Sequence, residues 1–64
     1  MIRVNGTDLS EYSKNLLQFL QEQGYQTNQI AVERNGEIIP KSTYQEVTLQ
    51  ENDVLEIVSF VAGG

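Results

Sequence analysis

The chain has 64 residues and a formal net charge of −5 at pH 7, from nine acidic and four basic residues. It contains no cysteine and no histidine, so thiolate chemistry, the commonest metal ligand and the usual general base near neutral pH are all missing. These absences argue against self-contained catalysis and against a metal site. The acidic balance argues against nucleic-acid binding, which needs clustered Lys and Arg.

The first predicted element is a β-hairpin. Ile2 and Val4 alternate with polar residues, which is typical of a half-buried strand. Asn5-Gly6 is a type I′ turn signal, because both of its central positions need positive φ and these residues tolerate it best. Residues 7–9 should then form a short return strand.

A helix should follow the hairpin. Ser10 and Ser13 are both candidate N-caps, and Ser13 is favoured because Tyr12 could then pack on Leu17 as a hydrophobic staple. Four apolar residues lie on or beside one helical face, namely Leu16, Leu17, Phe19 and Leu20. Gly24 is the natural C-terminal stop, which makes the helix about three turns long.

A second hairpin is predicted after a polar link at residues 27–29. Residues 30–32 indicate a buried strand with Ile30 and Val32 inward. Because helix crossovers usually join parallel strands, we expect its first partner to be the strand before the helix. Asn35-Gly36 repeats the type I′ signal, with Arg34 and Glu37 flanking it as a solvent-facing pair. The return strand, Ile38-Ile39, should stop at a proline.

The remaining residues lead to the last strand. Residues 41–47 suggest one short helical turn, capped by Ser42, that buries Tyr44 and Val47. Residues 50–53 indicate a polar turn, which explains Glu51 and Asp53 better than an acid–base or cation site does. The last strand should run from residue 54 to about residue 60.

This order of elements predicts an α+β fold. One main helix laid across a mixed sheet of four or five strands is the ubiquitin-like β-grasp arrangement, here as a single domain over residues 1–64. The last strand is then central and lies next to the first. Leu55 and Ile57 should face the core, whereas Val58 and Phe60 lie on the face that one helix cannot cover. Since exposed apolar patches often mark interfaces, we expect Val58 and Phe60 to contact a partner.

We expect residues 61–64 to form a flexible tail. Glycine has no Cβ, so a backbone that ends in Gly63-Gly64 can enter a narrow channel where bulkier residues would clash. Val61 and Ala62 should line that channel together with Gly63. Gly64 then presents a terminal carboxylate that a partner can activate chemically, and no residue of this chain is expected to be catalytic.

We also expect a cytoplasmic protein that is monomeric on its own. No apolar segment of a secretion signal follows the first residues, and nothing approaches the roughly 20 apolar residues of a membrane span. An acidic body suits docking onto a basic protein surface, although solubility explains the charge equally well.

Three segments resemble the ubiquitin-like sulfur carriers of bacteria. Residues 32–40 are similar to the central hairpin of that family, residues 53–58 to its last strand, and Phe60-Val61-Ala62-Gly63-Gly64 to its tail. The resemblance is greatest to the thiamine-pathway carriers, the ThiS family. Carriers of the molybdopterin pathway typically have prolines just before the tail, where this chain has Ser59-Phe60.

The resemblance implies a carrier cycle centred on Gly64. A ThiF-type adenylating enzyme would use ATP and magnesium to join the Gly64 carboxylate to AMP. A protein persulfide would supply the sulfur that converts it to a thiocarboxylate, and a ThiG-type thiazole synthase would accept that sulfur. The cofactors would all belong to the partners. Two alternatives stay open: a molybdopterin-pathway carrier, and a ubiquitin-like modifier conjugated through Gly64.

Overall fold

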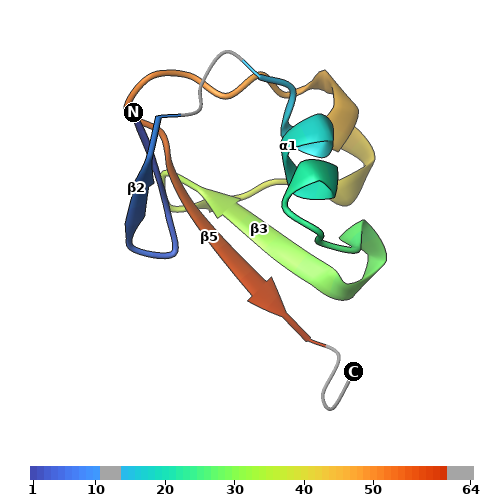
Figure 1. Ribbon diagram of the computed structural model, residues 1–64. Coiled ribbons are helices and arrows are strands. Elements are labelled where there is room, and N and C mark those ends of the chain that lie inside the picture. Colours follow the sequence, from blue (N-terminus) through green and yellow to red (C-terminus); the bar gives the residue numbers. More distant parts are fainter. Residues whose placement is uncertain (11–13, 61–64) are drawn as a thin grey trace.

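The computed structural model describes residues 1–10 and 14–60 (Figure 1). The predictions made for Tyr12 and for residues 61–64 therefore lie outside the described residues. In chain order, the elements are β1 (Ile2–Val4), β2 (Thr7–Leu9), α1 (Leu16–Glu22), the 3₁₀-helix η1 (Thr27–Gln29), β3 (Ile30–Arg34), β4 (Glu37–Ile38), the 3₁₀-helix η2 (Lys41–Glu46) and β5 (Val54–Ser59).

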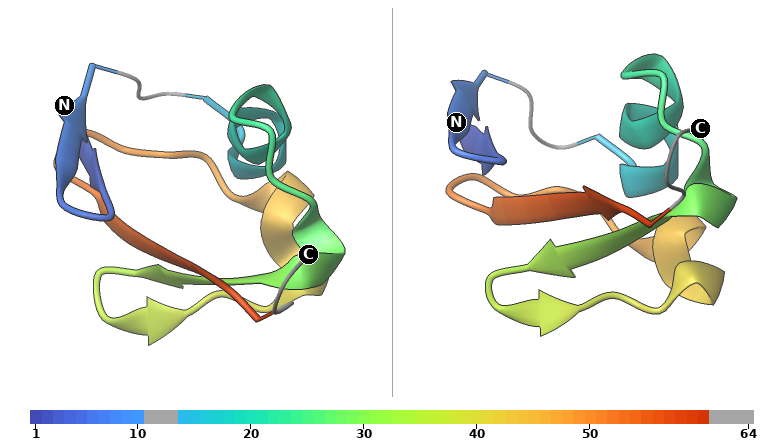
Figure 2. Two further views of the ribbon diagram at one scale, coloured as in Figure 1. Left: turned by 60° about the horizontal axis from the view of Figure 1, so that its bottom comes forward. Right: turned by 90° about the horizontal axis from the view of Figure 1, so that it is seen from below.

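The five strands form one mixed sheet in the order β2-β1-β5-β3-β4. The last strand, β5, is central as predicted, and it runs parallel to β1 and antiparallel to β3. α1 lies across one face of this sheet, away from the β1–β2 hairpin (Figure 2). The arrangement is the predicted α+β fold of β-grasp type.

The predicted pairing of β3 with the strand before the helix is wrong. β2 and β3 do run in the same direction, but β1 and β5 lie between them. The crossover through α1 leaves one strand position empty between β1 and β3. β5, the last strand in the sequence, occupies that position. β5 is therefore the element that joins the two hairpins into one sheet.

Both Asn-Gly turns have the predicted type I′ character. The φ values are 50° at Asn5 and 84° at Gly6 in the first turn, and 52° at Asn35 and 90° at Gly36 in the second. Positive φ at both central positions twists the chain in the sense that matches the twist of the flanking strands. Each hairpin is therefore closed by its own local sequence.

The start of α1 differs from the prediction. The N-cap is Asn15, not Ser13, and its Oδ1 accepts a hydrogen bond from the Gln18 N–H at 3.1 Å. Tertiary pairing decides the position: Leu16 N–H donates to the Val47 carbonyl, and Asn15 forms an isolated antiparallel bridge with Thr48. Asn15 is thus extended, and the helix that follows it has only about two turns.

The end of α1 is a Schellman motif, as the glycine predicts. Gly24 has φ 86°, its N–H donates to the Gln21 carbonyl at 3.1 Å, and the Tyr25 N–H donates to the Leu20 carbonyl at 3.0 Å. Tyr25 then packs against the core, half-buried.

The core lies between the inner face of the sheet and the helical segments. Its buried apolar members are Ile2, Val4, Leu16, Phe19, Leu20, Ile30, Val32, Tyr44, Leu49, Leu55 and Ile57. Leu17 and Val47 are half-buried at its margin.

The segment before the last strand contributes Tyr44 to the core from η2, as predicted. Ser42 is not its cap: the N-cap is Pro40, and the Thr43 hydroxyl donates to the Pro40 carbonyl at 2.8 Å. Proline fixes the entry conformation without a capping side chain. A turn then precedes β5, with the Asp53 N–H donating to the Gln50 carbonyl at 3.1 Å.

Candidate functional site

The candidate site is the end of β5, from which the chain continues into residues 61–64. β5 is hydrogen-bonded on both sides, to β1 along its first part and to β3 along its whole length. Its inward residues Leu55 and Ile57 are buried in the core. A strand held by two edges and one face opens rarely, so its end gives the residues that follow a fixed starting point.

The side chain of Asn5 extends the hydrogen bonding of β1 toward that end. Asn5 Oδ1 accepts a hydrogen bond from the Ile57 N–H at 2.7 Å, and Asn5 Nδ2 donates to the Ile57 carbonyl at 3.2 Å. The chain turns away from β5 at Asn5-Gly6, so no further peptide group of β1 can bond to Ile57. The Asn5 carboxamide takes the place of that peptide group. Sequence reasoning identified Asn5 as a turn former and missed this second role, because the carboxamide's partner lies 52 residues further along the chain.

Val58 and Phe60 point away from the core, as predicted. Val58 is 60% exposed and Phe60 is 59% exposed. The Phe60 N–H donates to the Gln29 carbonyl at 3.1 Å, and Lys41 Nζ lies 5.6 Å from the centre of the Phe60 ring. A cation over an exposed ring contributes about 0.5–1 kcal/mol, which positions the ring without burying it. The contact of these two residues with a partner stays a prediction.

The same face of the sheet carries two further exposed apolar side chains, of which only Val54 follows from the alternation along β5. Val54 is 40% exposed and Ile38 is 72% exposed. The strand register sets Glu33 opposite Glu56 and also opposite Ile38, so this face holds two facing carboxylates among apolar groups. Finding Ile38 required the register of β4, which its hydropathy alone does not give.

A buried carboxylate holds the other end of β5. Asp53 is 5% exposed, and its Oδ2 accepts hydrogen bonds from Arg34 Nε at 3.0 Å and from the Gln50 N–H at 2.8 Å. Its Oδ1 accepts one from Asn35 Nδ2 at 3.1 Å. Burial acts to raise the pKa of Asp53, but these hydrogen bonds and the Arg34 charge outweigh it and leave the pKa below its ordinary value of 3.8.

The predicted pair of Arg34 with Glu37 is therefore wrong. Arg34 Nη2 lies 2.9 Å from Asp53 Oδ2, whereas Glu37 is exposed. A buried carboxylate needs a cation and hydrogen-bond donors much more than a hydrated one does, so the guanidinium binds Asp53. Asp53 belongs to a structural cluster at the base of β5.

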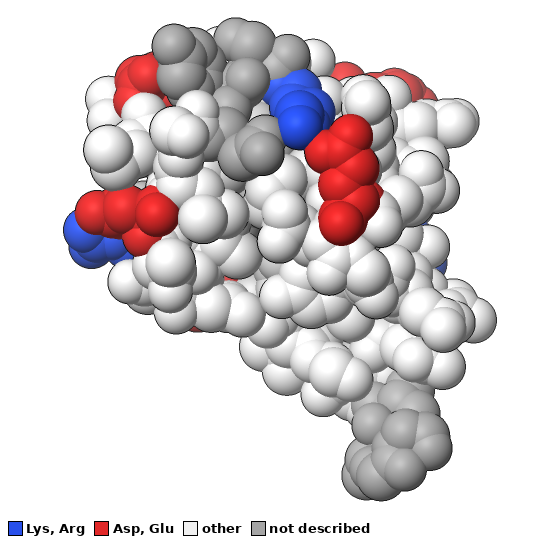
Figure 3. Space-filling model, viewed as in Figure 1, with Lys and Arg blue, Asp and Glu red and all other residues white. Residues whose placement is uncertain are grey.

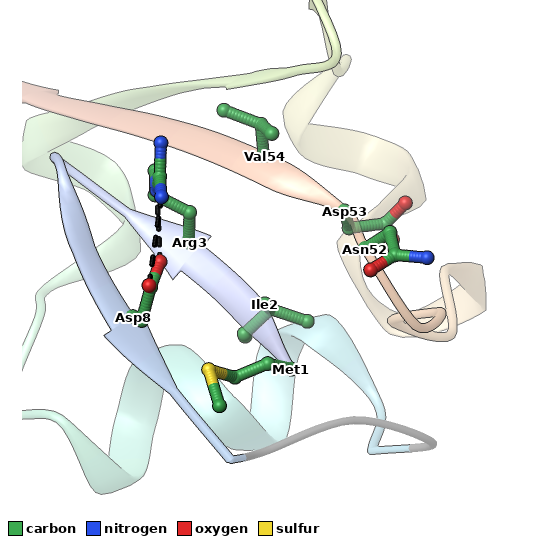
Figure 4. A pocket seen from close by; sticks show the side chains of 7 residues that line it. All are labelled: Met1, Ile2, Arg3, Asp8, Asn52, Asp53 and Val54. Atoms are coloured by element: carbon green, nitrogen blue, oxygen red, sulfur yellow. Dashed lines mark hydrogen bonds and ion pairs between the residues drawn. The ribbon is translucent and has the colours of Figure 1, made fainter.

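A shallow hollow of about 250 Å³ lies beside the start of β5 (Figure 4). It is lined by Met1, Ile2, Arg3, Asp8, Asn52, Asp53 and Val54. Arg3 and Asp8 pair across its rim at 2.8 Å, between Nε and Oδ1. Because Val54 opens β5 and the C-terminal residues follow Ser59, the hollow and the candidate site lie at opposite ends of the strand.

Within residues 1–10 and 14–60, no three acidic side chains gather closely enough to hold a metal ion. The same part of the chain contains no helix long and apolar enough to cross a membrane. The predicted threading residues Val61, Ala62 and Gly63, and the predicted activated residue Gly64, lie outside the described residues, so their roles stay predictions.

Comparison with known proteins identifies the family. The model of the ThiS family matches residues 1–64. The chain is 39% identical over 66 residues to the sulfur carrier protein ThiS of Bacillus subtilis, and the match covers all of both proteins. The crystal structure of the thiamine biosynthesis protein ThiS from Geobacter metallireducens superposes with a TM-score of 0.76 at 28% identity, covering 98% of this chain and 97% of that one.

A second kind of relative is much longer. The chain is 51% identical over 45 residues to a thiazole synthase of Paramagnetospirillum magneticum, a match that covers 70% of this chain and 14% of that protein. The chain thus spans only a small part of the thiazole synthases it matches. The family match over residues 1–64 and the full-length similarity to the Bacillus protein show that this chain belongs to the ThiS family.

Proposed function

We propose that this chain is a sulfur carrier protein of thiamine biosynthesis and not an enzyme. Its family and the name of its Bacillus relative support the carrier role. The relatives named thiazole synthase support the thiamine branch and a ThiG-type acceptor of the sulfur. The observation that carries the proposal is the anchoring of β5, on both edges as far as Ile57 and on the β3 side up to Phe60, ahead of a segment that ends in Gly63-Gly64.

The chemistry starts at the Gly64 carboxylate, which is a poor acyl donor. A ThiF-type enzyme joins it to the α-phosphate of ATP, so that pyrophosphate leaves and an acyl-adenylate forms. The terminal sulfur of a protein persulfide then attacks the acyl carbon and AMP leaves. A thiol cleaves the resulting S–S bond, which releases the thiocarboxylate that thiazole synthase consumes. ATP, magnesium and the catalytic side chains are supplied by the partners.

The folded part of the protein gives the partner a surface to bind. Val58 and Phe60 offer exposed apolar surface directly before Val61, so a partner that docks on them receives the tail at a fixed distance. The four residues after Phe60 can span roughly 13–14 Å when extended. When a partner binds Val58 and Phe60, Gly64 can therefore reach well inside a narrow channel of that partner.

The test is the mass of the intact chain after incubation with a ThiF-type enzyme, ATP, magnesium, a persulfide donor and a thiol. The proposal expects a gain equal to the exchange of one oxygen for sulfur. A chain that lacks Gly64 is the matched control and should gain nothing. An unchanged mass for the full chain under conditions in which a known ThiS is converted would overturn the carrier role.

The two alternatives differ from the proposed function in what happens to Gly64 or to its sulfur in the native host. A modifier would appear as an isopeptide adduct on other proteins through Gly64. A molybdopterin-pathway carrier would form the same thiocarboxylate but would not support thiazole formation by thiazole synthase. Growth of a host that lacks its own ThiS, on medium without thiamine, separates the thiamine branch from both.

A further inference from the structure

The backbone groups of β5 point alternately toward its two neighbouring strands. Toward β3, the Phe60 N–H donates to the Gln29 carbonyl at 3.1 Å, and the paired register places Glu56 and Val58 on the same side. Because the sides alternate along a strand, Leu55, Ile57 and Ser59 direct their N–H and carbonyl groups toward β1. The Asn5 N–H accordingly donates to the Leu55 carbonyl at 3.0 Å.

The edge of β5 that faces β1 is covered only as far as Ile57. Along this edge, the Arg3 N–H donates to the Asp53 carbonyl and the Asn5 N–H donates to the Leu55 carbonyl. The Asn5 carboxamide then makes two hydrogen bonds with the backbone of Ile57. At Asn5 the chain turns away into β2. Ser59, the next residue on this edge, is exposed. Its N–H and carbonyl point away from β3, and neither β1 nor the Asn5 carboxamide reaches past Ile57, so no described residue is placed to bond them. Figure 1 shows β5 continuing past the end of the β1–β2 hairpin, with β3 on one side and no element on the side of the hairpin.

This short edge has none of the usual protection. Natural sheets protect free edges with charged side chains, proline or bulges. Ser59 is instead flanked by Val58 and Phe60, both about three-fifths exposed. The surface over the last residues of β5 shows no charged side chain in the view of Figure 3. The charged Lys41 Nζ lies over the ring of Phe60, 5.6 Å from its centre, and not on the backbone of Ser59. An exposed strand edge whose own residues are uncharged is the feature that strand addition by a partner uses.

We propose that the Ser59 edge of β5 pairs with an extended segment of the adenylating enzyme, in the place that β1 leaves free beyond Asn5. The proposal rests on the proposed function, because an enzyme that encloses residues 61–64 must place its own backbone beside the residues just before them. The Ser59 N–H donates to that segment and the Ser59 carbonyl accepts from it. Since β5 is already fixed, the pairing costs little ordering of this chain.

Amide hydrogen exchange tests the pairing directly. In the free chain the Ser59 amide should exchange without protection, while the Phe60 amide, bonded to Gln29, should be protected and serves as the internal reference. In the complex with a ThiF-type enzyme, without ATP, both should be protected. A Ser59 amide that stays unprotected in a complex competent to adenylate Gly64 overturns the pairing and leaves the carrier function intact.

A variant gives a second readout. Ser59→Pro removes the N–H without breaking a bond of the β3 ladder, so the free energy of unfolding should change little, while the Kd for the enzyme should rise about two- to tenfold, as for one lost hydrogen bond. Ser59→Ala keeps the N–H and removes the hydroxyl; an equal rise in Kd for this variant would assign the contact to the side chain and overturn the inference. Protection of the Ser59 amide in a dimer of the free chain would overturn it in favour of a second copy.

Discussion

Asn5 and Asn35 hold β5 from opposite edges, Asn35 at its first residue and Asn5 near its middle. The Asn35 N–H donates to the Val54 carbonyl at 2.8 Å and Asn35 Oδ1 accepts from the Val54 N–H at 2.9 Å, while the Asn5 carboxamide makes both of its bonds to Ile57. Each asparagine is also the first central residue of a type I′ turn. The residues that close the two hairpins therefore also fix the strand between them.

Asn5→Gly should lower the free energy of unfolding by about 1–3 kcal/mol, because it leaves the Ile57 N–H and carbonyl without partners. Glycine keeps the positive φ of the turn, so the change removes little besides the carboxamide. Urea unfolding of both proteins measures the difference. Asn52→Gly is the matched control, since Asn52 also has positive φ (73°) and none of the described residues bonds to its side chain. Equal losses for the two variants would contradict the role assigned to the Asn5 carboxamide.

The Asp53 cluster should make stability depend on pH. The folded-state pKa of Asp53 lies below its ordinary value, so its stabilising contribution is present above about pH 4 and is lost as pH falls through the folded pKa. Asp53→Asn should cost about 3 kcal/mol near neutral pH, because it leaves Arg34 without its carboxylate. Urea unfolding across the acid range should show this gap narrowing. A gap that is constant with pH would show that the Asp53 charge contributes nothing.

Leu55→Ala and Phe60→Ala should separate stability from binding. Leu55 is fully buried, so its truncation should lower the free energy of unfolding by about 2–5 kcal/mol. Phe60 is mostly exposed, so its truncation should change stability by less than about 1 kcal/mol and weaken binding to the adenylating enzyme instead. Thermal melting and titration calorimetry measure the two effects. A loss of stability as large for Phe60→Ala as for Leu55→Ala would show that the two faces of β5 are assigned the wrong way round.

Gly64→Ala should leave the melting temperature unchanged and lower the rate of adenylation. The added Cβ would stand next to the carboxylate, where the proposed narrow channel would have no room for it. Pyrophosphate release by a ThiF-type enzyme measures the rate. Full activity of the alanine variant would show that the enzyme does not select for a bare backbone at this position.

The local sequence predicts those parts of the fold that short-range patterns control. The two Asn-Gly turns, the glycine at the end of α1 and the inward set of β5 depend on neighbouring residues, and all are as expected. The start of α1 and the partner of Arg34 depend on residues distant in the chain, Thr48 and Asp53, which no local pattern reveals. The predicted partner of β3 was wrong for the same reason, because its real partner, β5, lies far along the chain as the last strand.

The candidate site divides in the same way. Alternation along β5 predicts that Val58 and Phe60 face outward, and both do. The place of Ile38 on that face needs the register of β4, and the two bonds from Asn5 to Ile57 need the full sheet. Periodicity gives the direction of a side chain, whereas its neighbours across the sheet come from tertiary structure.

The two outermost strands are very short, three residues in β2 and two in β4. Sheets stack into fibrils when long, flat outer strands template each other, and here each outer strand offers too few backbone groups to do so. The two outer edges of this sheet should therefore not template polymerisation of the chain.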